Sequence, residues 1–310
     1  MNLRTLISWY QQYREVRDTM KIAVVGSINM DMTVLADRIP KKGETVAGSD
    51  LRYVPGGKGA NQAVAASRLG ADTAMYGCVG DDANGEKLLD NLRKQGVDGS
   101  KIKVVPGVPS GIAVITVADK DNVIVVVPGA NGCVDTAYVD SIADDLRQAD
   151  MVMLQHEIPQ ETIEYVIDLC DRADIPVVLN PAPARPVSQG TVNKVRWITP
   201  NETEAALIFG DRPIDEMLAD YPDKLVITLG SDGTAASDGK AVLHIPARKS
   251  EVVDTTGAGD TFNAAFSVRC AAGDSLEDAL RYANTAGGLA TEKFGAQGGM
   301  PSDEDVRRAM

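Results

Sequence analysis

Short apolar runs rich in β-branched residues alternate along the chain with segments whose apolar residues recur at helical spacing. In the first half, this pattern predicts strands at 21–28, 73–79 and 102–105 and helices at 59–70 and 84–95. In the second half, it predicts strands at 150–155, 176–179, 197–199 and 224–229 and helices at 160–173, 261–272 and 276–292. Such alternation is typical of an α/β fold with a parallel sheet and right-handed crossovers.

Two further segments, 33–53 and 111–127, consist of short β runs separated by turn signals. The second segment holds two runs around 119–122, which predicts a hairpin. We expect both segments to form one small β-sheet lid apart from the main sheet. Its apolar face has to be covered, either by closing over a ligand or by meeting another subunit.

The first twenty residues differ in pattern from the rest of the chain. Their apolar positions have helical spacing and are Leu3, Leu6, Ile7, Tyr10, Tyr13 and Val16. We interpret 1–20 as an amphipathic N-terminal extension, which is either the product of an upstream start site or a functional appendage. Residues 21–310 contain no linker or repeat and are interpreted as a single domain, with the lid from about 33–55 and 108–128.

Composition narrows the possible functions. With 310 residues, of which 44% are hydrophobic, the chain can bury a sizeable core. The formal charge of −13 argues against nucleic-acid and membrane partners and favours a small molecule. Four scattered cysteines and two histidines predict free thiols in the cytoplasm and neither a zinc site nor a disulfide framework. No apolar run is long enough to cross a bilayer.

The candidate for catalysis is the stretch 253–265, V-D-T-T-G-A-G-D-T-F-N-A-A, in which a short apolar run ends in glycines and continues as a helix. Without side chains, Gly257 and Gly259 let backbone N–H groups approach an anion, and the positive end of the helix dipole adds to this site. Asp260 lies in the first turn of that helix, where its carboxylate can act as a general base for a substrate hydroxyl. The pairing suggests phosphoryl transfer to an alcohol.

Other interpretations of this turn are possible. A glycine-rich turn with an aspartate cap is common wherever a strand leads into a helix. A dinucleotide fingerprint fits less well, because Phe262 stands where a third small residue is needed. A Walker loop fails as well, because the only other Gly-Lys pair places Gly59 after Lys58.

Two polar stretches in the first half could contact a substrate. Asn29 and Asp31 follow the first predicted strand, where they could clamp neighbouring hydroxyls or simply form a turn. The run P-G-G-K-G-A-N-Q-A then leads into a helix, so that its amides and Asn61 can approach a polar ligand. Lys58 is either a ligand contact or a solvated charge.

Six motifs, in this order, resemble those of the ribokinases in the PfkB-type carbohydrate kinase family. They are G-S-I-N-M-D, P-G-G-K-G-A-N-Q-A, N-P-A-P-A, T-P-N-E-T-E-A, T-L-G-S-D-G and D-T-T-G-A-G-D-T-F-N. The resemblance covers about residues 21–302. It implies a Rossmann-like three-layer α/β/α fold, the ribokinase-like fold, with a β lid that often pairs two subunits into a homodimer. It also implies ATP-dependent phosphorylation of D-ribose at the 5-hydroxyl.

The resemblance implies roles for individual residues. Asp260 is the general base, and the amides of Gly257, Ala258, Gly259 and Asp260 stabilise the transferring phosphoryl group. The residues that match sugar-contacting positions are Asn29, Asp31, Gly57, Lys58, Gly59, Asn61, Glu157 and Asp260. The residues that match nucleotide and magnesium positions are Asn201, Glu204, Thr228, Gly230, Ser231, Gly233, Gly259 and Asn284. Structural roles remain open for three of them, since Glu157 and Asn201 could be helix caps and Glu204 a solvated first-turn acid.

The resemblance further implies Mg²⁺ and an activating monovalent cation, usually K⁺, beside the glycine turn. The matching ligand positions are Asp254, Thr256, Ala290, Lys293, Gly295 and Gly299. Gly299 stands where relatives often have a serine, so we expect a Gly299→Ser variant to need less K⁺. The alternatives to a ribokinase are a kinase for deoxyribose or a nucleoside, and a non-catalytic sugar sensor. The last alternative requires loss of the base or of the anion hole, and both are present here.

Overall fold

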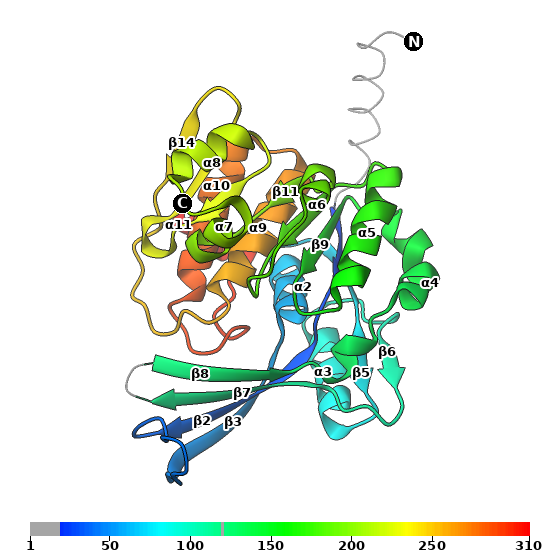
Figure 1. The fold of residues 1–310 in the computed structure, drawn as a ribbon, viewed down its shortest axis with the longest axis vertical. Coiled ribbons are helices and arrows are strands. Elements are labelled where there is room, and N and C mark those ends of the chain that lie inside the picture. Colours follow the sequence, from blue (N-terminus) through cyan, green and yellow to red (C-terminus); the bar gives the residue numbers. More distant parts are fainter. Residues whose placement is uncertain (1–18, 119–120) are drawn as a thin grey trace.

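The core of the molecule is a five-stranded parallel sheet with the strand order β11-β10-β9-β1-β4. In this computed structural model, which describes residues 19–118 and 121–310, the sheet lies between two layers of helices (Figure 1). Its strands are β1 (Lys21–Val25), β4 (Asp72–Tyr76), β9 (Met151–Gln155), β10 (Val177–Asn180) and β11 (Trp197–Ile198). Two isolated parallel bridges connect β11 and the chain after it with the segment of β12 (Val226–Thr228).

Successive side chains along the buried strands point to opposite faces of the sheet and so contribute to two separate cores. In β1, Ile22 and Val24 join the core on one face, while Ala23 and Val25 join the core on the other. Strands that are buried on both faces read as continuous apolar runs, which is why the central strands could be found in the sequence. The predicted α/β class with a parallel sheet and a separate lid is confirmed.

Helices from distant parts of the chain cover each face. In the described part of the chain, five helices contribute residues to the core on the first face. They are α2 (Lys58–Arg68), α3 (Ala83–Lys94), α9 (Ala258–Ala272), α10 (Leu276–Ala290) and α11 (Asp303–Ala309). On the second face they are α4 (Thr136–Leu146), α5 (Gln160–Arg172), α6 (Gln189–Lys194), α7 (Glu202–Phe209) and α8 (Ile214–Asp220). The sequence pattern did not identify α4, α6, α8 or α11. Among the described residues, no helix is both long and apolar enough to pass through a membrane.

The lid is a four-stranded sheet with the order β3-β2-β7-β8, which projects from the main body (Figure 1). It comprises β2 (Asn29–Ala36), β3 (Gly48–Gly56), β7 (Gly111–Ala118) and β8 (Asp121–Val127). Strands β7 and β8 pair antiparallel, as the predicted hairpin requires, although residues 119 and 120 at its tip lie outside the described residues. The side chains of Val123 to Val127 are 45–59% exposed, so β8 carries an uncovered apolar surface.

Two sequence-based predictions need correction here. The first strand ends at Val25, and Asn29 and Asp31 lie within β2 and not in a turn, because β2 pairs with both β3 and β7. The predicted strand 73–79 is two strands, β4 and β5 (Cys78–Gly80), separated by Gly77, whose missing side chain leaves room for the Gly26 carbonyl. The N-terminal extension 1–20 lies outside the described residues except for its last two positions.

Small elements complete the fold. β5 pairs in parallel with β6 (Lys103–Val105), while β12 forms an antiparallel sheet with β13 (Thr234–Ser237) and β14 (Val242–Ile245). Two short 3₁₀ turns span Gly129–Cys133 and Gly230–Asp232.

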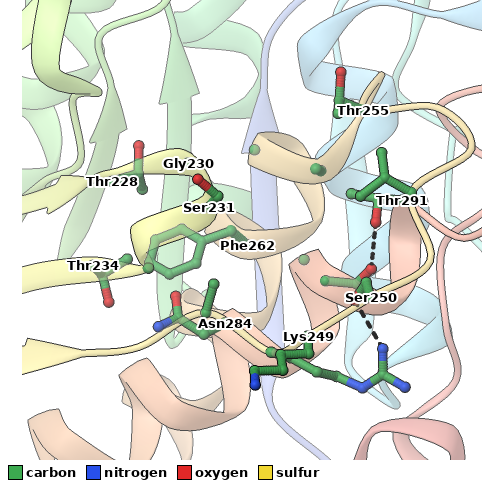
Figure 2. A pocket seen from close by; sticks show the side chains of 18 of the residues that line it. Thr228, Gly230, Ser231, Thr234, Lys249, Ser250, Thr255, Phe262, Asn284 and Thr291 are labelled. Carbon is green, nitrogen blue, oxygen red and sulfur yellow. Dashed lines mark hydrogen bonds between the residues drawn. The ribbon is translucent and has the colours of Figure 1, made fainter.

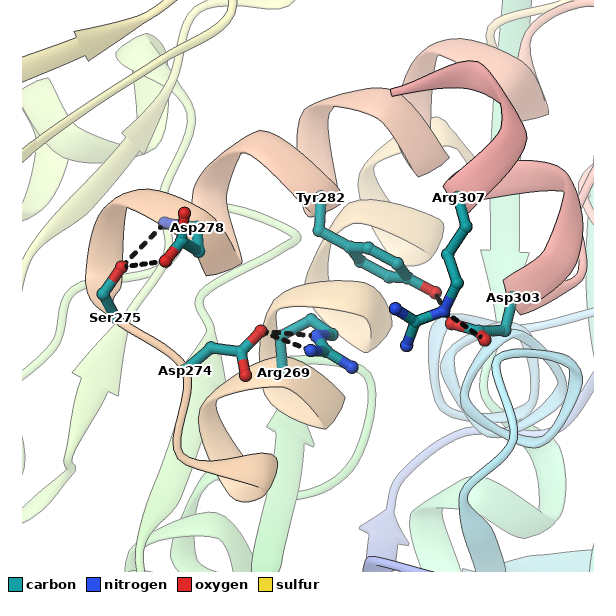
Figure 3. Close-up of polar contacts among 7 residues, drawn as sticks. All are labelled: Arg269, Asp274, Ser275, Asp278, Tyr282, Asp303 and Arg307. Carbon is teal, nitrogen blue, oxygen red and sulfur yellow. Dashed lines mark hydrogen bonds and ion pairs between the residues drawn. The ribbon is translucent and has the colours of Figure 1, made fainter.

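A polar cluster ties α11 to the helices beneath it (Figure 3). The Tyr282 hydroxyl donates to Asp303 Oδ1 at 2.7 Å, and Arg307 Nε donates to the other oxygen of that carboxylate at 2.7 Å. The guanidinium of Arg269, which is paired with Asp274, lies 5.2 Å from the centre of the Tyr282 ring. Tyr282 therefore joins α9, α10 and α11 in one contact network.

Tyr282→Phe should lower the free energy of unfolding by about 1 kcal/mol, because it removes one hydrogen bond to a charged group and keeps the ring contacts. Thermal unfolding should then occur about 2–4 °C lower, with unchanged activity. An unaltered melting temperature would show that the Tyr282–Asp303 bond adds nothing to stability.

Candidate active site

Helix α9 begins at a glycine that no other residue can replace without strain. Gly257 is the N-cap and has a left-handed backbone with φ of 79°. A Cβ at this position would lie 2.8 Å from Ala296 Cα. The predicted helix start at the glycine turn is thus observed, with the first helical residues at Ala258, Gly259 and Asp260. Amides in the first turn of a helix have no intrahelical acceptor, which leaves this end suited to an anion.

Asp260 is 7% exposed and is held by two side-chain amides. Asn61 Nδ2 donates to Oδ2 at 3.0 Å, and Gln62 Nε2 donates to Oδ1 at 3.2 Å. Burial raises the pKa of this carboxyl, while the charge of Lys58 and the amide donors act in the opposite direction. A carboxylate with a raised pKa that remains hydrogen-bonded on both oxygens is suited to accept a proton.

Four carboxylates and one ammonium group interact electrostatically beside α9. Burial, with the charges of Glu157 and Asp260, raises the pKa of Asp31 to about 7. Burial alone would lower the pKa of Lys58, but Asp260, Glu157 and Glu204 more than offset this, so that the net shift is upward. Glu157 accepts hydrogen bonds from Ser27 Oγ at 2.5 Å and from the Lys58 amide at 3.1 Å. Lys58 is therefore a partner of these acids and not an isolated surface charge.

The predicted sugar-contacting residues converge between the lid and the start of α2. Asn29 is buried, and its Oδ1 accepts from Asn131 Nδ2 at 2.6 Å, which leaves its own Nδ2 for another partner. Gly57 and Gly59 lie against the chain at Gly26 to Asn29, so close that a Cβ on either would be within 2.7 Å of backbone atoms. The glycines thus let α2 start directly beside the lid.

A cavity of about 230 Å³ extends from Asp260 toward α7. It is lined by Lys58, Asn180, Ala182, Thr199, Asn201, Glu204, Thr228, Thr255, Gly257, Gly259, Asp260 and Asn263. Asn201 and Glu204 form a capping box at the start of α7, in which each side chain bonds the other residue's backbone amide at 2.9 Å. The interpretation of Asn201 as a helix cap is therefore correct. Glu204 is nonetheless 7% exposed, and burial raises its pKa, so it is not a solvated acid.

A second, larger cleft of about 610 Å³ adjoins this cavity (Figure 2). It contains every residue of the predicted nucleotide set except Glu204: Asn201, Thr228, Gly230, Ser231, Gly233, Gly259 and Asn284. Figure 2 shows Phe262 of α9 and Asn284 of α10 around the same space as Ser231. Asn284 Nδ2 donates to the carbonyls of Ile245 and Pro246, which fixes the chain that borders the cleft. Gly233, with φ of 97°, allows this chain to pass, because a Cβ there would lie 2.1 Å from Ile245 O.

Only some of the predicted cation ligands contact one another. Asp254 accepts from the amide and hydroxyl of Thr256 at 2.9 and 2.6 Å and from the Gly295 amide at 2.8 Å. Gly299 lies so close to Ala290 that an added Cβ would be 2.0 Å from the Ala290 carbonyl oxygen. The geometry contradicts the idea that a serine at 299 would simply add a ligand, because its Cβ would displace the carbonyl expected to serve beside it. Among the described residues, no hydrogen bond or ion pair joins Lys293 to the other members.

Comparison with known proteins identifies the family. The model of the pfkB family carbohydrate kinases matches residues 19–303. The chain belongs to this family. This kinase is 50% identical to the ribokinase of Bacillus subtilis (strain 168) over 289 residues, 93% of this chain and 99% of the relative. It is 33% identical to the deoxyribokinase of Salmonella typhi over 303 residues, 94% of this chain and 99% of the relative.

A solved structure of Arabidopsis thaliana ribokinase complexed with ribose and ATP is similar to the kinase in its whole fold. The TM-score is 0.86 at 32% sequence identity, and the match covers 94% of this chain and 98% of that chain.

Several residues at the site of the kinase did not appear among the sequence-based candidates. Gln62 and Gln297 bond to Asp260 and Asn61, and Asn131 bonds to Asn29. Most of the missed cleft residues come from the segment 247–255, which has no periodic pattern. Gln62 could have been found, because it stands inside the motif G-K-G-A-N-Q. Asn131 and Gln297 are distant in sequence from what they touch.

Asp31→Asn should stabilise the ligand-free kinase at pH 8. The folded-state pKa of about 7 lies above the ordinary value of 3.8, so the stability associated with Asp31 is fully present below about pH 4 and is lost as pH rises toward 7. An amide does not titrate, so the variant escapes this loss. Melting curves should show the variant several degrees above wild type at pH 8, with a gap that narrows toward pH 4; a gap independent of pH would contradict the assignment.

Proposed function

We propose that this kinase transfers the γ-phosphoryl group of ATP to the 5-hydroxyl of D-ribose and so makes D-ribose 5-phosphate. The main observation that supports this proposal is the position of Asp260. It is buried at the start of α9 beside the small cavity, and the larger cleft adjoins that cavity. The 50% identity to the Bacillus subtilis ribokinase over almost the whole chain supports ribose as the sugar.

The chemistry follows from this arrangement. Asp260 takes the proton of the sugar hydroxyl while the oxygen of that hydroxyl attacks the γ-phosphorus of ATP. The bond between the γ-phosphorus and the oxygen that bridges it to the β-phosphorus breaks, which releases ADP. The amides of Gly257 to Asp260 hold the charge on the transferring group. Phosphoryl transfer needs mainly positioning and charge stabilisation, which preformed backbone amides at a helix start provide.

Sugar recognition is assigned to the polar groups at the junction of the lid and α2. Asp31 and Asn29 accept and donate to ring hydroxyls, with Asn61, Glu157 and Lys58 around them. Asp31 is largely buried next to other acids, so hydroxyl donors from a sugar would stabilise its carboxylate. A panel of pentoses and nucleosides would separate ribose from deoxyribose, the sugar named for the Salmonella relatives.

Magnesium is assigned to the phosphates of ATP, near Glu204 and Asn201. Among the described residues, no group of three or more His, Cys, Asp or Glu side chains could hold a metal ion. This fits an ion carried in largely by phosphate oxygens and water, with one protein carboxylate nearby. When bound, it would offset the charge on the phosphates.

A monovalent cation is assigned to the turn at Asp254. The fit rests on the donors, which are a carboxylate and backbone oxygens, the ligands that hard cations prefer. Burial acts to raise the pKa of Asp254, but hydrogen bonds from Thr256 and Gly295 outweigh it and hold the pKa below its ordinary value. An ionised Asp254 therefore offers a negative charge beside the glycine turn. A bound cation would add positive field there.

A homodimer formed through the lid would cover the apolar surface of β8. Val123 to Val127, with Leu51 and Tyr53 of β3, are about half exposed in the single chain. Apolar groups arranged together on one sheet are typical of an interface. A cytoplasmic location is proposed because all four cysteines are free thiols.

Asp260→Asn should reduce kcat at least about 10³-fold while ribose binding changes little, because the amide keeps the shape but cannot accept a proton. Steady-state kinetics, with ribose binding by calorimetry, would measure both. A variant that keeps more than about a tenth of wild-type kcat would remove Asp260 from the base role.

Asp254→Asn should raise the potassium concentration for half-maximal activity about tenfold, the equivalent of about 1.4 kcal/mol in cation binding. Potassium is titrated at fixed ionic strength with sodium as the balancing ion, and Glu251→Gln on the same exposed segment is the charge-matched control. Gly299→Ser should raise the requirement too, because its Cβ displaces the Ala290 carbonyl. Absence of activation in wild type would rule out the cation site.

A further inference from the structure

Two chains of side-chain amides end on the two oxygens of Asp260. In the first, Asn91 Nδ2 donates to Gln297 Oε1 at 2.8 Å, Gln297 Nε2 to Asn61 Oδ1 at 3.1 Å, and Asn61 Nδ2 to Asp260 Oδ2 at 3.0 Å. In the second, Gln155 Nε2 donates to Gln62 Oε1 at 2.7 Å, and Gln62 Nε2 donates to Asp260 Oδ1 at 3.2 Å. Each of these bonds is donated in the direction of Asp260, and Gln62 Nε2 also donates to Asn180 Oδ1 at 3.2 Å.

The direction of each chain decides what Asp260 receives. An amide group has a donor end and an acceptor end, so if Gln297 donates to Asn61 Oδ1, the Nδ2 of Asn61 must face the carboxylate. Reversal of Asn61 would place an oxygen against an oxygen of Asp260. The side chains of Gln297, Asn61 and Gln62 are at most 5% exposed, so water has little access to replace a lost partner.

In the second chain, the orientation of the Gln155 amide leaves one buried oxygen without a hydrogen bond. Gln155 Oε1 is buried and has no hydrogen-bond partner in the described part of the chain, while Gln155 Nε2 is committed to Gln62. The unpaired oxygen lies over Gly26, where a Cβ would be 2.1 Å away. An unsatisfied buried oxygen is unusual in a folded protein, and here it accompanies a donor that supports the base.

We propose that Gln297 and Gln155 are positioning residues for the reaction, because they fix Asn61 and Gln62 so that each oxygen of Asp260 receives one N–H. This inference rests on the proposed role of Asp260 as the base. The fixed donors hold the carboxylate plane in one orientation, leaving the remaining lone pairs for the proton of the substrate hydroxyl.

Gln297 also belongs to the segment that carries the assigned cation ligands. Gly295 of this segment donates its amide to Asp254, and the Gln297 carbonyl accepts from Arg68 at 2.7 Å. Phe294 stacks under the Arg52 guanidinium of lid strand β3 at 4.8 Å from the ring centre. The backbone of Gln297 is therefore held independently of its side chain, so that the side chain can be replaced while the segment stays anchored.

Gln297→Met replaces the amide by a side chain of similar length without a strong donor. We expect kcat to fall about tenfold, which corresponds to the loss of one buried hydrogen-bond partner of the network. We also expect the acid limb of the kcat profile to move to higher pH, since a looser Asn61 stabilises the ionised base less. The charged groups that face Asp260, which are Lys58, Glu157 and Asp31, are unchanged in this variant.

The matched control is Tyr282→Phe, whose contact with α11 is remote from the amide chains and which should lose a similar amount of stability. Its pH profile should equal that of wild type. Gln155→Met, on the other oxygen, should shift the acid limb in the same direction as Gln297→Met, which tests the inference even where one variant fails to fold.

Two outcomes would overturn the inference in different ways. If Asp260→Asn is inactive but both methionine variants keep the wild-type pH profile, the amides do not position the base, and the proposed function stands. If Asp260→Asn keeps more than about a tenth of kcat, the proposed base role fails and this inference fails with it.

Discussion

The structure depends on the balance of interactions around one buried carboxylate, that of Asp260. Burial opposes ionisation of Asp260, and Glu157 adds to this, whereas Lys58 and the amides of Asn61 and Gln62 favour the ionised form. These opposing groups come from the first and middle thirds of the chain, and Asp260 itself comes from the last. Because an ionised carboxylate that is buried without partners is costly, Asp260 can ionise only when all of these segments are in place.

The parallel sheet explains how distant segments meet at this carboxylate. Strands β1, β9 and β10 run side by side, and each is followed by polar residues of the site: Asn29 and Asp31, Glu157, and the N-P-A-P-A turn. In open α/β sheets the carboxyl ends of the strands form the ligand-binding edge. Helix α9 packs against α2, so that Asp260 lies next to Asn61 and Gln62 of that helix.

Local features of the site were accessible from the sequence, whereas contacts between distant segments were not. The glycine turn, the helix after it and Asp260 in its first turn follow from residue types alone. The strand that holds Asn29 and Asp31 was not predicted and a turn was left open there, because pairing with both β3 and β7 overrides the turn preference of these residues. Gly299 was expected to lack only a hydroxyl, and its fit against Ala290 could not be known without the fold. Gln297 and Gln155 were missed because spacing does not show where a side chain points.

In the proposed reaction, the amide surroundings of Asp260 also determine where the proton that it accepts can go. Amide groups do not gain or lose protons near neutral pH, so neither chain can carry the proton onward to the back of the molecule. The route that remains leads through the cavity in which the proton was taken up. In that proposed reaction, Asp260 can lose its proton only after the product has left the cavity, so that each turnover ends with a proton leaving by the path of the product.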